Sequence, residues 1–252
     1  MRITILGCGS SGGVPRVGND WGLCDPNEPK NRRRRCSILV ENGGTRVLVD
    51  TSPDLREQLL DAEVKDLDAV IWTHEHADQT HGIDDLRALV IDRRHRLDGY
   101  ADERTLAALR QKFGYVFDRR PGSLYPPLVN GQVIGGPFRV GAVDIVPFDQ
   151  DHGGIISLGF RFGGIAYSSD VVGLSDEAFA ALRGLDVWIV DALRHEPHPS
   201  HAHVAMTLDW IAEIKPKRAI LTNLHHTLDY AALKRELPPG VVPAYDGMVV
   251  TA

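Results

Sequence analysis

The hydrophobic positions of this chain fall mostly into short runs that are rich in β-branched residues. Runs of this length and composition are typical of β-strands, and Gly163-Gly164 between two of them predicts a hairpin turn. Strands are expected over residues 2–6, 36–41, 45–49, 69–72, 187–190 and 219–222. From residue 129 to residue 168 one strand is expected after another, most clearly over 143–148, 157–162 and 165–167.

Other segments repeat their apolar residues at helical spacing. Leu55, Leu59 and Leu60 form one such stripe, and Ser52 before Pro53 is expected to cap the start of that helix. Further helices are expected after Gly82 and over residues 102–113, 175–182, 204–214 and 230–237. Each half of the chain thus begins with strands and ends with helices, an order that two face-to-face sheets with helices on both outer sides would satisfy. The predicted fold class is α+β, a four-layer αββα sandwich formed by residues 1–252 as a single domain.

The composition is that of an ordinary globular protein, with 43% hydrophobic and 25% charged residues. The three cysteines, Cys8, Cys24 and Cys36, are odd in number and contain no Cys-x-x-Cys pair, so a disulfide framework is not expected. No apolar run has the length of a signal peptide or a membrane span. We therefore expect a cytoplasmic protein without a membrane partner.

With a formal net charge of −6, the chain lacks the overall positive charge that is typical of a non-specific nucleic-acid binder. Residues 90–150 also contain no basic, glycine-rich arm that could hold RNA. One local exception is Arg32-Arg33-Arg34-Arg35, directly before an expected strand. These four cations could attract a phosphate-bearing ligand or could simply be the solvated start of the strand, and the sequence leaves both interpretations open.

The segment that follows the expected strand at 69–72 contains as many potential metal ligands as a metal site requires. It contains His74, His76 and Asp78 at alternate positions. Residues two apart in extended chain point the same way, so the two histidines can bind one ion while Asp78 reaches the next position. A lone histidine at a strand end is usually only solvated, and the pattern therefore needs ligands from elsewhere in the chain.

Other expected strands also end in residues of ligand type. His152 follows one strand, Asp170 follows another, and the segment from Thr222 to His226 follows a third. Side chains delivered at several strand ends can form one site along an edge of a β-sandwich.

In this order of motifs the chain resembles the metallo-β-lactamase superfamily. The motifs are Asp50 after a strand, His74-x-His76-x-Asp78, His152, Asp170 and the segment 222–226. Within the superfamily the chain is most similar to the branch that holds the phosphoribosyl cyclic phosphodiesterase of phosphonate breakdown, with tRNase Z and PqqB-type proteins nearby. The features that carry this likeness are Gly12-Gly13-Val14-Pro15, Arg34-Arg35-Cys36-Ser37, Ser169-Asp170 and Tyr245-Asp246-Gly247-Met248.

The resemblance implies a metallo-β-lactamase fold and a set of metal ligands. His74, His76 and His152 are expected to bind the first ion, and Asp170 is expected to bridge to a second. Neutral imidazole suits zinc or manganese. Members with a di-iron redox centre typically carry Glu where His76 stands, so this position favours hydrolysis.

The chain departs from the family pattern at two positions. Gln79 and Asn223 stand where the family expects histidine ligands of the second metal, beside Asp78. A neutral amide oxygen is a poorer zinc ligand than imidazole, so the second site is expected to be weak, selective for a harder ion, or empty. His81 or His225 could substitute as a ligand, or each could be a surface or hydrogen-bonded histidine. Relatives with a structural zinc use clustered cysteines where only Cys24 remains, so no structural zinc is expected.

The leading functional hypothesis is a metal-dependent phosphodiesterase in which a metal-activated hydroxide attacks a small cyclic phosphodiester or a nucleotide-like substrate. Asp78 would orient or deprotonate the water, and His201 or His226 would donate a proton to the leaving oxygen. The alternatives are tRNase Z-like RNA processing, thioester or lactam hydrolysis, and a non-catalytic nucleotide-binding module with a weakened second site. The expected partner is a small phosphate-containing substrate, and the resemblance suggests a homodimer.

Overall fold

Two mixed β-sheets pack face to face in this computed structural model, which describes residues 1–93, 95–119, 121–122 and 124–252. Arg94, Arg120 and Ser123, which belong to the segment expected to lack an RNA-binding arm, lie outside the described residues. The first sheet has the order β15 (Val249–Thr251), β1 (Arg2–Gly7), β2 (Ser37–Asn42), β3 (Thr45–Val49), β4 (Ala69–Ile71), β5 (Leu97–Ala101), β6 (Val129–Val133). The second has the order β11 (Gly173–Leu174), β8 (Val143–Asp151), β9 (Ile156–Phe162), β10 (Ile165–Ser168), β12 (Val187–Asp191), β13 (Arg218–Thr222), β14 (Val241–Pro243), and β7 (Phe138–Val140) pairs with β8.

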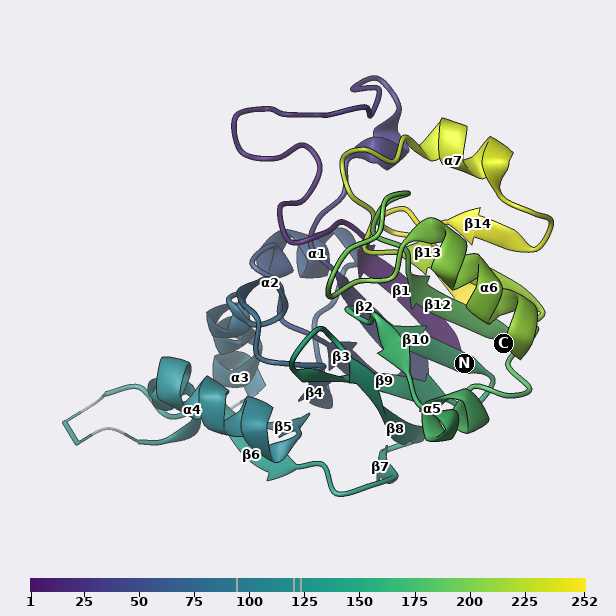
Figure 1. Ribbon diagram of the computed structural model, residues 1–252. Helices are drawn as coiled ribbons and strands as arrows, with labels where there is room; N and C mark the ends of the chain where they lie inside the picture. Colours follow the sequence, from purple (N-terminus) through teal and green to yellow (C-terminus); the bar gives the residue numbers. More distant parts are fainter. Residues whose placement is uncertain (94, 120, 123) are drawn as a thin grey trace.

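Helices cover the outer face of each sheet (Figure 1). The helical elements before β6 are η1 (Pro29–Asn31), α1 (Leu55–Asp61), α2 (Ala77–Thr80), η2 (Ile83–Asp85), α3 (Leu86–Arg93) and α4 (Glu103–Phe117). Those after β10 are α5 (Asp176–Ala181), α6 (Val204–Ile214) and α7 (Tyr230–Glu236). The four-layer αββα sandwich is therefore confirmed. No helix in the described part of the chain is both long and apolar enough to cross a lipid bilayer.

Alternation along the strands divides the buried side chains among the layers. In β3, Val47 and Val49 enter the core between the sheets, whereas Leu48 packs in the outer core with Trp72. Strand β12 repeats the pattern in the other sheet, where Ile189 faces inward and Trp188 faces the helices. Because successive side chains point to opposite faces, strands buried on both faces read as the continuous apolar runs seen in the sequence.

Phe160 tests the contribution of the core between the sheets. Its side chain is fully buried on β9, so replacement by alanine leaves a cavity that the two packed sheets cannot close completely. We expect Phe160→Ala to lower the free energy of unfolding by about 3–5 kcal/mol in urea titrations. The control Leu60→Ala, at a residue that is 56% exposed, should change it by less than about 0.5 kcal/mol. Equal effects of the two substitutions would contradict this placement of the core.

Most expected elements agree with the structure, but the start of the first helix does not. Helix α1 begins at Leu55 with Asp54 as its N-cap residue, so the expected cap at Ser52 is wrong. The Ser52 hydroxyl donates a hydrogen bond to Gln58 Oε1 (2.8 Å) and accepts one from the Asp54 backbone N–H (3.1 Å). These bonds satisfy a tight turn before the helix and leave the first helical turn to start later.

Three strands end in residues with left-handed backbone conformation. Asp50 (φ 63°) follows β3, Asp170 (φ 56°) comes shortly after β10, and Asn223 (φ 61°) follows β13. Asp and Asn tolerate this conformation better than most residues, although it still has an energetic cost. Backbone strain concentrated at neighbouring strand ends is typical of a functional site, and these ends lie beside the loop after β4.

Candidate metal centre

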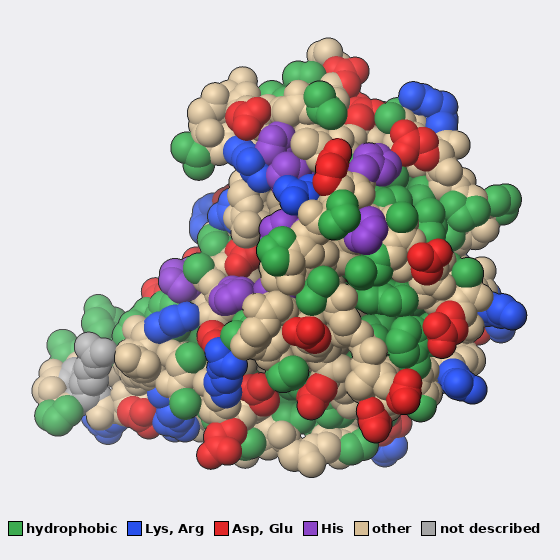
Figure 2. Space-filling view, in the orientation of Figure 1, with side chains coloured by type: hydrophobic (Ala, Val, Ile, Leu, Met, Phe, Trp, Pro, Cys, Tyr) green, Lys and Arg blue, Asp and Glu red, His purple; other side chains and the backbone are tan. Residues whose placement is uncertain are grey.

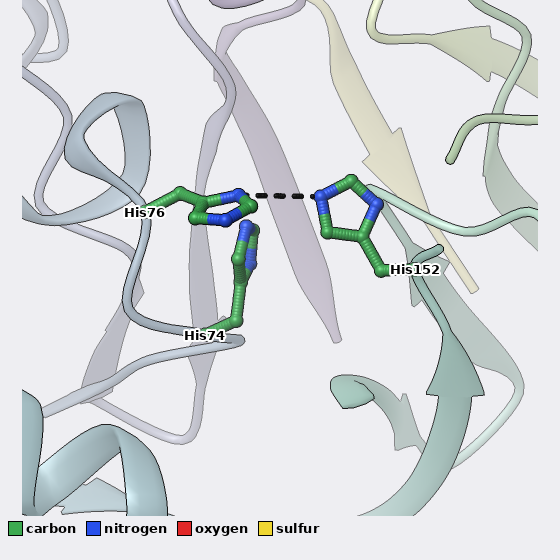
Figure 3. A group of neighbouring side chains, drawn as sticks. All are labelled: His74, His76 and His152. Atoms are coloured by element: carbon green, nitrogen blue, oxygen red, sulfur yellow. Dashed lines mark hydrogen bonds between the residues drawn. The ribbon is translucent and has the colours of Figure 1, made fainter. Parts of the chain in front are cut away.

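Three imidazole rings from two parts of the chain converge at this edge of the sandwich (Figure 3). His74 and His76 come from the loop after β4, and His152 comes from the turn after β8. Each offers a ring nitrogen within 4.8 Å of the others. The ring centroids lie 4.6 to 5.1 Å apart, and the rings meet edge to face. The structure thus places together the three histidines that the sequence suggested for the first metal.

The hydrogen bonds of His152 indicate that the ring nitrogen facing this cluster is unprotonated. Its Nδ1 lies 2.7 Å from the Ser200 backbone carbonyl, which can only accept, so Nδ1 carries the proton. In the neutral ring Nε2 then holds a lone pair, and it faces His76 Nδ1 at 3.3 Å. A carbonyl that orients a ligand histidine in this way is common at metal sites.

His74 is oriented by a chain of hydrogen bonds from Asp50. In its carboxylate form Asp50 accepts from the Thr73 hydroxyl (3.0 Å), and the Thr73 oxygen then accepts from His74 Nδ1 (3.0 Å). The opposite nitrogen, Nε2, is buried and has no hydrogen-bond partner among the described residues. Burial lowers the pKa of His74 to about 3, so its ring is neutral near pH 7. A buried ring nitrogen with a free lone pair beside two other imidazoles fits a divalent ion such as zinc or manganese.

A second group of ligand atoms adjoins the first. His152, Asp170 and His201 also offer atoms within 4.8 Å of one another. Burial alone would raise the pKa of the Asp170 carboxyl, but His74, His201 and His152 outweigh it and lower that pKa. An ionised Asp170 at this position can face a cation beside the three imidazoles.

The two amides that replace family histidines present their nitrogens to Asp170. Gln79 Nε2 donates to Asp170 Oδ2 (3.1 Å), and Asn223 Nδ2 donates to Asp170 Oδ1 (3.4 Å) and to Asp191 Oδ2 (3.3 Å). Both Asp170 oxygens therefore accept hydrogen bonds from these two amides. Amide N–H donors in this arrangement compete with a second cation.

Asp191, at the end of β12, is a site residue that sequence reasoning missed. Its Oδ2 lies 2.8 Å from His201 Nδ1, and both side chains are close to Asp170. Burial alone would lower the pKa of His201, but the neighbouring Asp191 and Asp170 carboxylates raise it to about 9. Asp191 ends a strand as Asp50 does, so the rule that polar residues follow buried strands could have identified it.

The remaining candidates occupy different surroundings. Asp78 lies half-buried on α2, belongs to neither group of ligand atoms, and has its pKa raised to about 6 by burial and by Asp170. The His81 ring packs against Phe113 (5.2 Å), and His225 Nε2 contacts the Arg16 guanidinium. The His226 ring lies against Gly22 and stacks on His225 (4.1 Å).

Comparison with known proteins identifies the family. A model of the β-lactamase superfamily domain matches residues 45–225. The chain belongs to this superfamily. The resemblance read from the motifs is confirmed, and membership supports a hydrolase.

Several proteins are similar over most of this superfamily member. A Porphyromonas gingivalis protein named octanoyltransferase is 34% identical over 255 residues, which cover 98% of this chain and 51% of that protein. The chain thus spans about half the length of this curated relative. The crystal structure of a diphosphatase from the PhnP family has 34% identity and a TM-score of 0.92, covering 100% of this chain and 97% of the other.

More distant structures share the fold alone. Zinc-bound PqqB from Methylobacterium extorquens has 18% identity and a TM-score of 0.77, covering 100% of both chains. The short form of human tRNase Z has 16% identity and a TM-score of 0.70, covering 100% of this chain and 99% of the other.

The arginine run of this superfamily member is divided among different roles. Arg33 is almost fully buried, and its guanidinium donates to the backbone carbonyls of Leu228 (2.7 Å) and His225 (3.3 Å). Arg34 pairs with Asp61, Arg35 pairs with Asp54, and Arg32 lies over the Trp21 ring. Neither interpretation left open by the sequence describes Arg33, which instead holds the turn after β13.

Asp246, whose carboxylate binds backbone N–H groups near the site, should make the stability of the protein depend on pH. The half-buried Asp246 carboxylate accepts from the backbone N–H groups of Arg34 (2.8 Å) and Cys8 (3.1 Å), yet loss of solvent around it raises its pKa to about 6. A carboxyl group whose folded pKa exceeds its unfolded value contributes stability below the unfolded pKa and loses it as pH rises through the folded pKa. We expect the free energy of unfolding to fall between about pH 4 and pH 6 by up to about 3 kcal/mol from this group. In urea titrations across this range, Asp246→Asn should show a smaller decrease, and an unchanged slope would contradict the assignment.

Proposed function

We propose that this protein is a metal-dependent phosphodiesterase that acts on a small phosphate-containing substrate. The observation that carries the proposal is the buried, unpartnered His74 Nε2 in a cluster of three imidazoles beside Asp170. The similarity to a PhnP-family diphosphatase at 34% identity over the whole chain favours a phosphate substrate. We do not propose acyl transfer, the activity in the name of the octanoyltransferase relative, because this chain spans only about half of that protein.

The metal ligands in this proposal are His74, His76 and His152, with Asp170 beside them. A divalent ion bound there would lower the pKa of water and offset charge on the phosphate oxygens. The protein's own contribution is the fixed orientation of His74 and His152 and the burial of these two rings and of Asp170, which strengthens electrostatic interactions there.

We assign proton transfer to Asp78 and His201. As a water oxygen attacks phosphorus and the bond to the leaving oxygen breaks, Asp78 accepts the proton of the water. His201 donates the proton from Nε2 to the leaving oxygen, because its Nδ1 is bound to Asp191. Asp191 is the positioning residue that orients this ring and favours its protonated form. His226 is a less suitable donor because its ring contacts Gly22 and His225.

Metal analysis followed by an activity assay tests this function. The purified chain should bind about one zinc or manganese ion and should cleave bis-p-nitrophenyl phosphate when that metal is supplied. Chelation should remove the cleavage, and added metal should restore it. A chain that neither binds metal nor shows metal-stimulated cleavage would be a non-catalytic module.

The pH profile tests the role of His201 as the proton donor and of Asp191 as the residue that positions it. Asp191→Asn removes the charge that raises the pKa of His201, so the alkaline limb of the kcat profile should move to lower pH. A merely structural role of Asp191 would lower kcat without moving this limb.

A further inference from the structure

Two polar groups in and beside a glycine turn next to the metal centre are not used by the proposed chemistry. The turn comprises residues 7–13 between β1 and the long loop that follows it. It contacts the segment after β13, because Gly9 forms a bridge with Leu224 and the Ser10 backbone N–H donates to the Leu224 carbonyl. Leu224 directly follows Asn223, which donates to Asp170. The turn is therefore next to the metal centre.

The first of these groups is the Ser10 hydroxyl. Ser10 is only 4% exposed, and its Oγ has no hydrogen-bond partner among the described residues. A buried hydroxyl without a partner has a free-energy cost that a ligand oxygen would remove. Its neighbour Ser11 is exposed, so the burial is specific to Ser10.

The second group is the Arg16 guanidinium. Its side chain crosses the turn at Gly12, where an added methyl group would lie 3.1 Å from both Cγ and Nε of Arg16. In the described part of the chain Arg16 forms no ion pair with a carboxylate, whereas Arg34 and Arg35 each have one. A glycine at position 12 thus permits an unneutralised cation to lie across the turn.

His225 holds this guanidinium in place without neutralising it. A guanidinium only donates, so His225 Nε2 accepts from Arg16, and the protonated Nδ1 donates to the Thr227 hydroxyl (2.9 Å). Among the described residues the guanidinium has no second hydrogen-bond partner, so most of its five N–H donors are available to a ligand. His225 is two residues from Asn223, a span of at most about 7 Å along the chain. The cation is therefore held beside the segment that carries Asn223, a partner of Asp170.

We propose that Ser10 and Arg16 form a subsite for a second phosphate group of the substrate, next to the scissile phosphodiester. This inference rests on the proposed function and narrows the substrate class to molecules with two neighbouring phosphates. The planar guanidinium binds a phosphate through paired hydrogen bonds, and the serine hydroxyl donates a further one. Figure 2 shows histidine side chains in a band across one face of the molecule, with Lys and Arg side chains beside them.

Paired substrates test the subsite. ADP-ribose carries two adjacent phosphates, whereas bis-p-nitrophenyl phosphate carries one. With the metal-loaded protein, Arg16→Gln should raise the KM for ADP-ribose at least about tenfold more than the KM for bis-p-nitrophenyl phosphate, and Ser10→Ala should show a smaller difference in the same direction. The matched controls are Arg32→Gln, which removes a cation that lies over Trp21, and the exposed neighbour Ser11→Ala. Equal changes for both substrates in Arg16→Gln would overturn the subsite.

A binding measurement separates failure of the subsite from failure of the proposed function. Calorimetry with α,β-methylene-ADP, which is not hydrolysed, should give a Kd about tenfold weaker for Arg16→Gln than for the unsubstituted protein and for Arg32→Gln. This result would support the subsite even if the protein cleaved neither substrate, an outcome that would reject the phosphodiesterase alone. Unchanged affinity in Arg16→Gln would reject the subsite, whatever the activity.

Discussion

Replacing His152 with alanine should remove the bound metal and reduce metal-dependent phosphodiester cleavage by roughly a thousandfold or more. The structure provides three converging imidazoles, and His152 is the one that comes from the other sheet. Two histidines from the loop after β4 cannot enclose an ion from both sides, and a site with three protein ligands loses most of its affinity when one is lost. Loss of the ion removes several kcal/mol of charge stabilisation in the transition state.

Metal content and kcat/KM should be measured together for this variant. His195→Ala is the matched control, because His195 also lies in a loop of the second sheet but pairs with Glu236 (3.4 Å) away from the cluster. The control should retain metal and activity. Circular dichroism should show that both variants remain folded, since the His152 side chain belongs to none of the three apolar clusters that form the core. A His152→Ala protein with full metal content would show that the cluster is not the metal site.

The sequence was sufficient to predict the layers and the place where the site forms. Strands buried on both faces leave a strong apolar signal, and the polar residues that follow them must emerge at the sheet edge. The pattern therefore predicts that His74 and His152 lie near each other, although 78 positions separate them in the chain. It does not predict how their rings are oriented. The start of α1 was less predictable, because Ser52 forms hydrogen bonds within a turn that competes with a helix cap.

Side-chain direction was the part that sequence could not supply. The sequence suggests Gln79 and Asn223 as weak oxygen ligands, but their amide nitrogens face the carboxylates of Asp170 and Asp191. An amide has a donor end and an acceptor end, and tertiary neighbours decide which end faces a given group. Arg33 shows the same limit, since nothing in a run of four arginines indicates that one of them binds backbone carbonyls in the interior.

Restoring histidine at both departures, in the double variant Gln79→His and Asn223→His, should raise the metal content from about one toward two ions per chain. The present amides donate to both oxygens of Asp170, so they satisfy the carboxylate without a second cation. Imidazole would remove these donors and supply a nitrogen lone pair in their place. Asp170 would then be free to bridge two ions, and Asp78 would be available as a ligand rather than as a base.

Metal stoichiometry after gel filtration in zinc or manganese is the measurement for this variant. Each single substitution should give an intermediate value, because either remaining amide still occupies one Asp170 oxygen. Gln111→His adds a histidine at an exposed position of α4 and controls for non-specific binding by an added imidazole. An unsubstituted protein that already binds two ions would show that the amides accept a second metal and that Asp78 acts beside it. A double variant that still binds one ion would instead show that the surrounding backbone, including the left-handed Asn223, limits the second site.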